Sequence, residues 1–415
     1  MIFKKIKLGQ IAKLNTKNIS KNHYYKYINY LDTSNLTKNK ILNIQRFDID
    51  NAPSRAKRLV DNKDILYSSV RPNQLHYGIL DNIKIENLVV STGFNVIKCE
   101  NDVNPYFIYY YIIQNEITEK MQGIAENSTT TYPSIRPGDL ENIDIMLPEK
   151  KEQDKIAHIL YKLDKKIETN NQTNNNLQEI SKQLYKRWFI DFEFSNEDGN
   201  PYKSSGGKMI DSELGKIPEG WNIYKLDELF YHISPGTNYQ PKRVETGIPF
   251  LNVKNINNGY IDTTDSKYIT EEDYKKVHKS WKPEENDLLL SRIGTIGLVT
   301  TIRQEDLPLA VHYNFIVLKT NSLPFEFAYF LLQSDDFQSK YRYCVKQSVQ
   351  EYVTVEDAKN IKVALPKNNV LYDIFIKNYE RILNIQRENK NLEQLRDTLL
   401  PKLMNGEIDL DNIEI

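Results

Sequence analysis

Cysteine is nearly absent from this chain. Cys99 and Cys344 are the only two thiols among 415 residues, and they lie far apart in the sequence. A cysteine-rich metal site is therefore excluded, and two isolated thiols fit a reducing cytosol. The six histidines show neither an H-E-x-x-H pattern nor a clustered spacing. We therefore expect no metal bound by this chain.

The sequence also lacks a long hydrophobic run. Its longest apolar stretch, YFIYYYII at 106–113, is far short of the roughly 20 residues that a membrane-spanning helix needs. The first residues, MIFKKIKLGQIAKL, contain no apolar core of the length found in signal peptides. These two absences predict a soluble, cytoplasmic protein.

Motifs for two kinds of nucleic-acid enzyme are missing. Transfer of a methyl group to the adenine amino group needs an Asn/Asp-Pro-Pro-Tyr/Phe loop, and no Pro-Pro dipeptide occurs. An ATP-driven translocase needs the phosphate loop G-x-x-x-x-G-K-[ST]. The stretch SSGGKM at 204–209 lacks both the correctly spaced first Gly and the Ser/Thr. We expect neither activity, and no bound cofactor, in this chain.

What the sequence does contain is an internal repeat. At an offset of 218 residues, KLGQIAKL (7–14) aligns with KLDELFYH (225–232), and DLENIDIMLP (139–148) aligns with DAKNIKVALP (357–366). Further weak matches occur between these anchors in the same order. A repeat of this length is no solenoid, whose units span roughly 20–50 residues. It predicts a domain and a helix that have been duplicated together.

Each copy has the same internal plan. Short β-like runs, cut by Gly, Pro and Asn turns, contain one helical piece, near 105–122 and again near 325–340. A Leu-Pro dipeptide closes the domain, and a long polar helix follows. The predicted fold class is α+β, with two tandem α/β domains separated by two long helices. The expected boundaries are a first domain at 1–149, a central long helix at 150–190, a linker at 191–211, a second domain at 212–366, a C-terminal long helix at 367–405 and a tail at 406–415.

The central helix has to pass through ETNNQTNNNL (168–177), which contains five asparagines. Apolar residues recur at heptad spacing on both sides of this stretch and keep one register across it, which is typical of a coiled-coil seam with a polar layer. A flexible polar linker is the alternative, because Asn disfavours helices. We predict a helix of about 37 residues, roughly 55 Å long, paired antiparallel with the C-terminal helix. The predicted seam residues are Ile156, Leu160, Leu163, Ile167, Asn170, Asn174, Leu177, Leu184, Ile382, Ile385, Asn389, Leu392 and Leu399.

Two similar but non-identical domains joined by paired helices form a pseudo-dimer within one chain. Proteins with two-fold symmetry read two DNA half-sites whose spacing is set by their geometry. Domains that have diverged would read an asymmetric, split sequence. The helix pair would then fix the distance between the two half-sites.

Four segments carry a family resemblance: SELGKIPEGW (212–221), KLDEL (225–229), KQLYKRWFIDFE (182–193) and LLPKLMNGEI (399–408). They resemble the conserved segments of the DNA-specificity (S) subunit of type I restriction–modification enzymes, and the resemblance covers essentially the whole chain. It implies that each domain is a target recognition domain, that the helices form a coiled coil and that the chain is non-catalytic.

The same resemblance implies a role in phage defence and a set of binding partners. They are double-stranded DNA, two methylating (M) subunits and two ATP-driven restriction (R) subunits, with no membrane. Adenine methylation and DNA cleavage would then reside in the partner subunits. S-adenosylmethionine, ATP and Mg would be bound there too. A methylation-only complex, without restriction subunits, is an open alternative.

Two other classes of protein compete with this interpretation. A nuclease would need grouped acidic residues and a Lys, which PEEND (283–287) and ENK (388–390) supply in type. The first stretch is predicted to lie in a turn and the second in a coiled coil, where charges usually face solvent.

A purely structural coiled-coil scaffold is the other alternative, and two large aromatic-rich domains argue against it.

Local charge favours one half of the first domain as a DNA surface. Residues 1–71 hold eleven Lys and four Arg against five Asp, whereas residues 72–148 hold four basic against ten acidic residues. Phosphate binding requires such local positive charge. Residues 211–366 hold eighteen basic against twenty-two acidic residues. Neutral hydrogen bonding should therefore supply more of the affinity of the second domain.

Candidate DNA contacts are polar residues in turns and after predicted strands, because such donors read base edges or hold phosphates. For PSRAKR (53–58) a merely solubilising turn is an equal alternative. The candidates of the first domain are Arg55, Lys57, Arg58, Ser69, Arg71, Asn73, His76, Tyr132 and Arg136. Those of the second domain are Lys242, Arg243, Arg292, Thr295, Tyr313, Asn314, Gln347, Gln350 and Tyr352.

Aromatic residues crowd the end of the central helix, in YKRWFIDFEF (185–194). The simpler interpretation is a cap that packs the helix end against a domain. The alternative is a docking surface for the methylating subunit, which the family resemblance permits.

Overall fold

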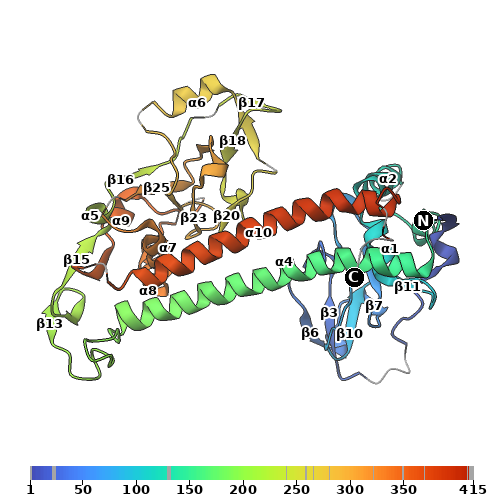
Figure 1. Cartoon of the computed structure of the whole chain (residues 1–415), viewed down its shortest axis with the longest axis horizontal. Coiled ribbons are helices and arrows are strands. Elements are labelled where there is room, and N and C mark those ends of the chain that lie inside the picture. Colours follow the sequence, from blue (N-terminus) through green and yellow to red (C-terminus); the bar gives the residue numbers. More distant parts are fainter. Residues whose placement is uncertain are drawn as a thin grey trace. The chain divides into compact units, whose positions relative to one another are not determined.

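The computed structural model (Figure 1) describes residues 2–20, 25–128, 132–239, 241–257, 259–264, 266–279, 281–320, 322–347, 350–368, 370–408 and 410. Most of the expected tail, at 409 and 411–415, lies outside this part. The chain forms two compact units, one made of Met1–Thr169 with Glu388–Ile415 and the other of Asn170–Arg387. The division falls inside both long helices, so each unit contains a globular head and one half of each helix.

The head of the first unit contains two four-stranded sheets. One is antiparallel, in the order β2 (Ala12–Leu14), β11 (Phe94–Cys99), β8 (Ile65–Ser68) and β9 (Tyr77–Ile79). The other has the order β6 (Gln45–Asp48), β3 (Tyr27–Leu31), β10 (Leu88–Ser91) and β7 (Ala56–Leu59), with β3 and β10 parallel. β8 and β10 are buried along their whole length, which explains their continuous apolar sequences.

Smaller elements complete this head. β1 (Lys4–Lys7) pairs with β12 (Asp144–Leu147), and β4 (Leu36–Thr37) pairs with β5 (Lys40–Ile41). The helices are α1 (Pro105–Ile112), α2 (Asn115–Glu126) and α3 (Pro137–Glu141).

The head of the second unit repeats this plan. Its antiparallel sheet has the order β16 (His232–Pro235), β25 (Phe315–Lys319), β22 (Leu288–Ser291) and β23 (Val299–Thr301). Its other sheet has the order β17 (Arg243–Val244), β21 (Lys267–Ile269), β18 (Ile248–Leu251) and β24 (Ala310–Val311), with β18 and β24 parallel.

Further strand pairs and short helices complete the second head. The strand pairs are β15 (Trp221–Lys225) with β26 (Lys362–Pro366), β13 (Met209–Ser212) with β14 (Gly215–Pro218), and β19 (Ile256–Asn257) with β20 (Tyr260–Ile261). The helices are α5 (Leu226–Leu229), α6 (Glu271–Val277), α7 (Phe325–Gln333), α8 (Asp335–Tyr343) and α9 (Val355–Lys359). The α+β fold with tandem domains is confirmed. Each single helical piece expected from the sequence is two helices. In the second head, Ser334 caps the start of the second one, because its hydroxyl accepts from the Phe337 NH over 3.2 Å.

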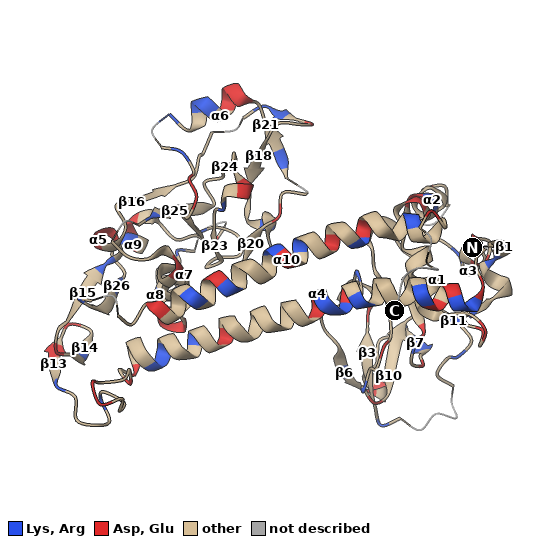
Figure 2. Cartoon of the chain, viewed as in Figure 1, with Lys and Arg blue, Asp and Glu red and all other residues tan. Residues whose placement is uncertain are grey.

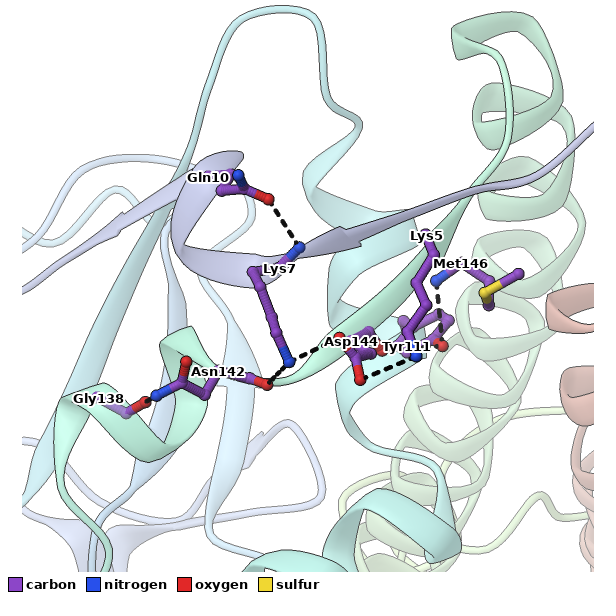
Figure 3. Close-up of polar contacts among 8 residues, drawn as sticks. All are labelled: Lys5, Lys7, Gln10, Tyr111, Gly138, Asn142, Asp144 and Met146. Carbon is purple, nitrogen blue, oxygen red and sulfur yellow. Dashed lines mark hydrogen bonds and ion pairs between the residues drawn. The ribbon is translucent and has the colours of Figure 1, made fainter.

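In each head a lysine near the start of the domain is hydrogen-bonded to an asparagine near its end. The Lys7 ammonium donates to the carbonyl oxygen of Asn142 over 2.9 Å (Figure 3), and the Lys225 ammonium donates to Oδ1 of Asn360 over 3.0 Å. Each Asn side chain also donates over 2.9 Å to the carbonyl oxygen four residues before it. These residues align at the offset of 218, so the structure confirms the duplication.

The two heads have diverged within this shared frame. Asp144 lies opposite Lys7 in the β1–β12 pair, and its carboxylate forms an ion pair with the Lys7 ammonium over 2.7 Å (Figure 3). The counterpart of Asp144 opposite Lys225 is Lys362, which instead pairs with Glu213 of the β13–β14 hairpin. A reversed charge at one position gives the second head a contact that the first head does not make.

The asparagine-rich stretch is helical. α4 (Lys150–Tyr185) runs through it without a break and continues into a π-helical turn at Lys186–Ile190, and α10 (Asp373–Met404) is the second long helix. Residues 169–178 contain no charged side chain, which Figure 2 shows as a tan part of α4. Asn170 and Asn174 are buried, as expected for a polar layer in a seam.

Within each unit the two helix segments pair antiparallel. In the first unit Lys166 contacts Glu388 over 3.3 Å and Asp164 contacts Arg396 over 2.8 Å. In the second unit Asn378 donates to Ser181 over 3.0 Å. All thirteen predicted seam residues are buried or half-buried. The predicted antiparallel coiled coil is confirmed.

The aromatic residues after α4 pack into the core of the second head. The Phe189 ring lies 4.9 Å from that of Phe327 and 5.5 Å from that of Trp221. Residues of the expected linker 191–211 fold back as well, because Phe194 stacks on Tyr202 at 4.7 Å and on Trp221 at 5.4 Å. The geometry favours a cap over an exposed docking surface.

Candidate nucleic-acid interface

The turn after β8 lies beside the segment that precedes α3. The Ser69 carbonyl oxygen accepts from the Ile135 NH over 2.9 Å, and the Arg71 NH donates to the Pro133 carbonyl oxygen over 3.0 Å. Two segments about 60 residues apart in sequence are thereby joined. We name the five predicted residues that they bring together the first-head cluster: Ser69, Arg71, Asn73, Tyr132 and Arg136.

Arg71 is an exposed cation of this cluster. Its backbone adopts a left-handed conformation with φ of +47°, which is unusual for a residue with a Cβ. Its guanidinium carbon lies 5.6 Å from the ring centroid of Tyr132, which is 60% exposed. A cation on an aromatic face is held in place while its donors stay available for an anion.

α2 holds the turn that carries the cluster. The turn is a 3₁₀ helix at Pro72–Gln74, and the Asn73 NH donates to Oε1 of Gln122 over 3.2 Å. Arg136 caps α3 with its backbone, whose NH donates to Asp139 over 2.7 Å, and this leaves its side chain exposed. Sequence reasoning missed Gln122, because its partner lies 49 residues away.

Other predicted residues of the first head are not equally available. Arg55 and Lys57 are exposed. Arg58 is half-buried and donates to Asn18 over 3.1 Å, and burial lowers the pKa of its guanidinium. Nδ1 of His76 lies 3.0 Å from Oγ1 of Thr37. The geometry therefore gives Arg58 and His76 structural contacts and weighs against a role in DNA contact.

The second head repeats the arrangement around different side chains. The Arg292 NH donates to the Asn314 carbonyl oxygen over 2.7 Å, and its own carbonyl oxygen accepts from Val353 over 3.0 Å. The same two backbone bonds are made by Ser69 in the first head, to Gly93 over 2.7 Å and from Ile135 over 2.9 Å. Ser69 and Arg292 therefore occupy equivalent positions.

The guanidinium of Arg292 serves the fold of its own head. Its Nε donates to the Val353 carbonyl oxygen over 2.7 Å, and Nη1 donates to the Tyr313 carbonyl oxygen over 3.3 Å. Arg292 is half-buried as a result. Sequence reasoning placed Arg292 on the DNA, and the structure uses two of its five guanidinium donors to join two loops.

The remaining candidates of the second head fall into two groups. The exposed ones are Lys242, Arg243, Thr295, Gln347 and Gln350, and the half-buried ones are Tyr313, Asn314 and Tyr352. Asn314 donates from Nδ2 to Oδ1 of Asn252 over 3.2 Å. Contact with DNA remains a prediction for all of these residues.

Two residues of the acidic stretch that suggested a nuclease are paired with one lysine of the second head. The Lys319 ammonium lies 2.6 Å from Glu284 and 2.9 Å from Asp287, and burial raises the pKa of the Asp287 carboxyl. Across the described residues, no three His, Cys, Asp or Glu side chains are grouped so that they could hold a metal ion. Within the same ranges, no helix has the length and apolar character needed to cross a membrane.

Comparison with known proteins agrees with this geometry. Residues 3–179 and 218–394 both match the family described as "Type I restriction modification DNA specificity domain". The Type I restriction enzyme HindI specificity subunit of Haemophilus influenzae is 27% identical over 98% of this chain and 99% of its own length. The MjaIX specificity subunit of Methanocaldococcus jannaschii is also 27% identical, over 79% of this chain and 74% of its own.

A solved structure shows the same fold. The S subunit of a type I restriction–modification system from M. genitalium covers 97% of this chain with 96% of its own, at a TM-score of 0.53 and 17% identity. The two family matches coincide with the two halves of the duplication and cover most of the chain. The chain therefore belongs to the family of type I restriction–modification DNA specificity subunits.

Proposed function

We propose that each head reads one half of a split, asymmetric DNA target. The observation that carries this proposal is a shared frame with different side chains on it. Ser69 and Arg292 make the same two backbone hydrogen bonds, yet the exposed residue two positions after Ser69 is Arg71 and the one two positions after Arg292 is Gly294. Equivalent turns with different donors and acceptors would read different bases.

The first head would derive more of its affinity from phosphate contacts. Arg71, Arg136 and Arg55 are exposed in the basic half of this head or next to it. Lys and Arg contacts to phosphates position a protein on DNA and make its binding salt-dependent. Base reading would then fall to neutral groups in the same cluster, such as Asn73.

Catalysis would reside in partner subunits. The relatives are named as specificity subunits of type I restriction enzymes, which supports methylating and restriction subunits as partners here. S-adenosylmethionine, ATP and Mg would be bound by those partners. A complex that only methylates remains the second candidate, because the chain would serve both kinds of complex in the same way.

The decisive experiment is to sequence the methylome of cells that express this chain with its neighbouring subunits. We expect one bipartite, asymmetric motif that disappears when the chain is deleted. Exchanging residues 212–366 for the corresponding domain of a relative should change one half of the motif and leave the other half intact. A symmetric motif, or loss of both halves after the exchange, would contradict the proposal.

The purified chain supplies a second test. It should bind duplex DNA without altering it when no partner subunit is present. Methyl transfer or strand cleavage by the purified chain alone would contradict the assignment of catalysis to partners and would favour the nuclease alternative.

A further inference from the structure

The turn that carries Arg71 has a counterpart without a side chain. Arg71 follows Val70, which bridges to Ser134, and Gly294 follows Ile293, which bridges to Tyr352. Both residues have a left-handed backbone, with φ of +47° at Arg71 and +85° at Gly294. Gly294 therefore occupies the position of Arg71, and the second head has no cation there.

A helix packs against this turn in both heads. Gln122 of α2 accepts from the turn residue Asn73, and Gln338 of α8 donates to the turn residue Gly297 over 3.0 Å. Gln338 and Arg342 are four residues apart on α8, so they lie on the same face of that helix. Arg342 is the eighth residue of α8, as Gln122 is of α2.

The two heads thus distribute charge across this contact in opposite ways. In the first head the turn carries Arg71 and the facing helix carries the neutral Gln122. In the second head the turn sequence GTIG (294–297) is uncharged, and the facing helix carries Arg342. We propose that Arg342 is a DNA phosphate contact of the second head, with the role that Arg71 has in the first. This inference rests on the proposed function of the heads.

Other cations near this turn are already engaged. The Arg292 guanidinium donates to two carbonyl oxygens. Lys346 pairs with Asp357 over 2.8 Å, and Lys340 pairs with Asp336 over 2.7 Å. The Arg342 side chain is exposed and makes neither an ion pair nor a hydrogen bond to any described residue. Its donors are therefore available to a phosphate.

Sequence comparison of the repeats could not reveal this exchange. One of the weaker repeat matches aligns DILYSSV (64–70) with DLLLSRI (287–293) and points to Arg292, whose guanidinium bonds to its own head. Arg342 lies about 50 residues further along the chain, in a helix whose sequence gives no sign of contact with the turn. The hydrogen bond from Gln338 is what places this helix face beside residues 294–297.

The test uses the full chain and a random-sequence DNA duplex library, with affinity measured as a function of salt concentration. Arg342→Gln, which copies the residue of the first head, should weaken binding about tenfold at low salt. It should also lower the magnitude of the salt slope by about one, since one phosphate contact is lost. Arg381→Gln, an exposed arginine on α10, is the matched control and should leave both quantities unchanged.

A second variant separates charge from structure. Adding Gly294→Arg to Arg342→Gln places the cation where the first head has it. A Cβ at Gly294 would meet nothing within 4 Å, although its φ of +85° strains any side chain there, as the left-handed backbone does at Arg71. We expect the double variant to recover affinity and salt slope. Arg342→Gln with unchanged binding, or a loss that Gly294→Arg does not restore, would overturn the inference.

The variant Arg71→Gln shows whether a negative result concerns only the role of Arg342 or also the proposed function of the heads. If Arg71→Gln weakens binding and Arg342→Gln does not, the first head binds DNA as proposed and only the role of Arg342 fails. If the wild-type chain and its complex with methylating subunits show no DNA binding at any salt concentration, both conclusions are overturned.

Discussion

Arg396 of α10 donates from Nη1 to Oδ1 of Asp164 on α4 over 2.8 Å, within the first unit. The other carboxylate oxygen of Asp164 accepts from the hydroxyl of Tyr110 on α1 over 2.7 Å. One carboxylate thus joins both long helices to the first head. Arg396 also contacts Asp397, and these acidic neighbours raise the pKa of its guanidinium even though burial alone would lower it.

Removing this carboxylate should destabilise the first unit. Asp164→Ala leaves the Tyr110 hydroxyl and the Arg396 guanidinium without their shared acceptor in a partly buried site. We expect a loss of about 1–3 kcal/mol in the free energy of unfolding, measured by urea denaturation. Glu168→Ala is the control on the same helix, because it removes an exposed ion pair to Lys165 and should cost below about 0.5 kcal/mol. Equal effects of the two variants would refute the role of Asp164.

Stability should depend on pH through His278. This residue is 2% exposed, and its ring lies 4.9 Å from the rings of both Tyr274 and Trp281. Burial lowers the pKa of its imidazole from 6.5 to about 4, while Lys282 adds a smaller effect in the same direction. Between these two pH values the His278 imidazole is protonated in the unfolded chain and neutral in the folded chain. The stability of the second head should therefore fall as pH decreases from about 6.5 to 4.

His278→Phe keeps an aromatic ring in this site and removes the titrating group. The unfolding free energy of the variant should fall less over this pH range than that of the wild type, by on the order of 1 kcal/mol. His158→Gln, an exposed position on α4, serves as the control and should follow the wild-type curve. Parallel curves for His278→Phe and the wild type would show that His278 does not contribute.

Arg71 should contribute to DNA affinity through charge. Arg71→Ala should weaken binding of a duplex about tenfold at low salt and lower the magnitude of the salt slope by about one. Lys84→Ala is the control, because Lys84 is an exposed cation in the same head outside the first-head cluster. Circular dichroism should show that both variants stay folded. A salt slope that is unchanged in Arg71→Ala would mean that Arg71 contacts no phosphate.

The repeat and the long helices could be predicted from sequence because their signals are local or periodic. The heptad register continues through Asn170 and Asn174, and burial of both residues follows from that register. The strands β8 and β22 could be aligned because both are short apolar runs ending in serine. Patterns of this kind depend on neighbours within one element, which a single sequence contains.

The availability of each candidate side chain could not be predicted in the same way. Arg71 and Arg292 have the same chemistry and follow equivalent strands, yet one is exposed and the other donates to Val353, 61 residues away. His76 contacts Thr37 across 39 positions of sequence. Whether a polar group faces solvent or contacts its own chain depends on partners that are distant in the sequence, and composition does not predict these partners.

The last prediction concerns the helices that the two units share. α4 and α10 both run from one unit into the other, and their seam has a heptad register. Inserting seven residues after Thr173 lengthens α4 by about 10 Å, close to three base pairs of DNA rise, and keeps the phase of the seam. α10 must be lengthened equally, near Asn389, so that the seams still match.

With both insertions, the two halves of the methylated motif should persist while the gap between them grows. Sequencing the methylome of cells that express the variant complex measures this directly. Inserting two residues instead turns the seam by about 200° and should prevent folding, because buried and exposed faces exchange. If the double seven-residue insertion leaves the gap unchanged, the helices do not set the spacing. The buried asparagines would then have no role in setting the distance between the two DNA half-sites.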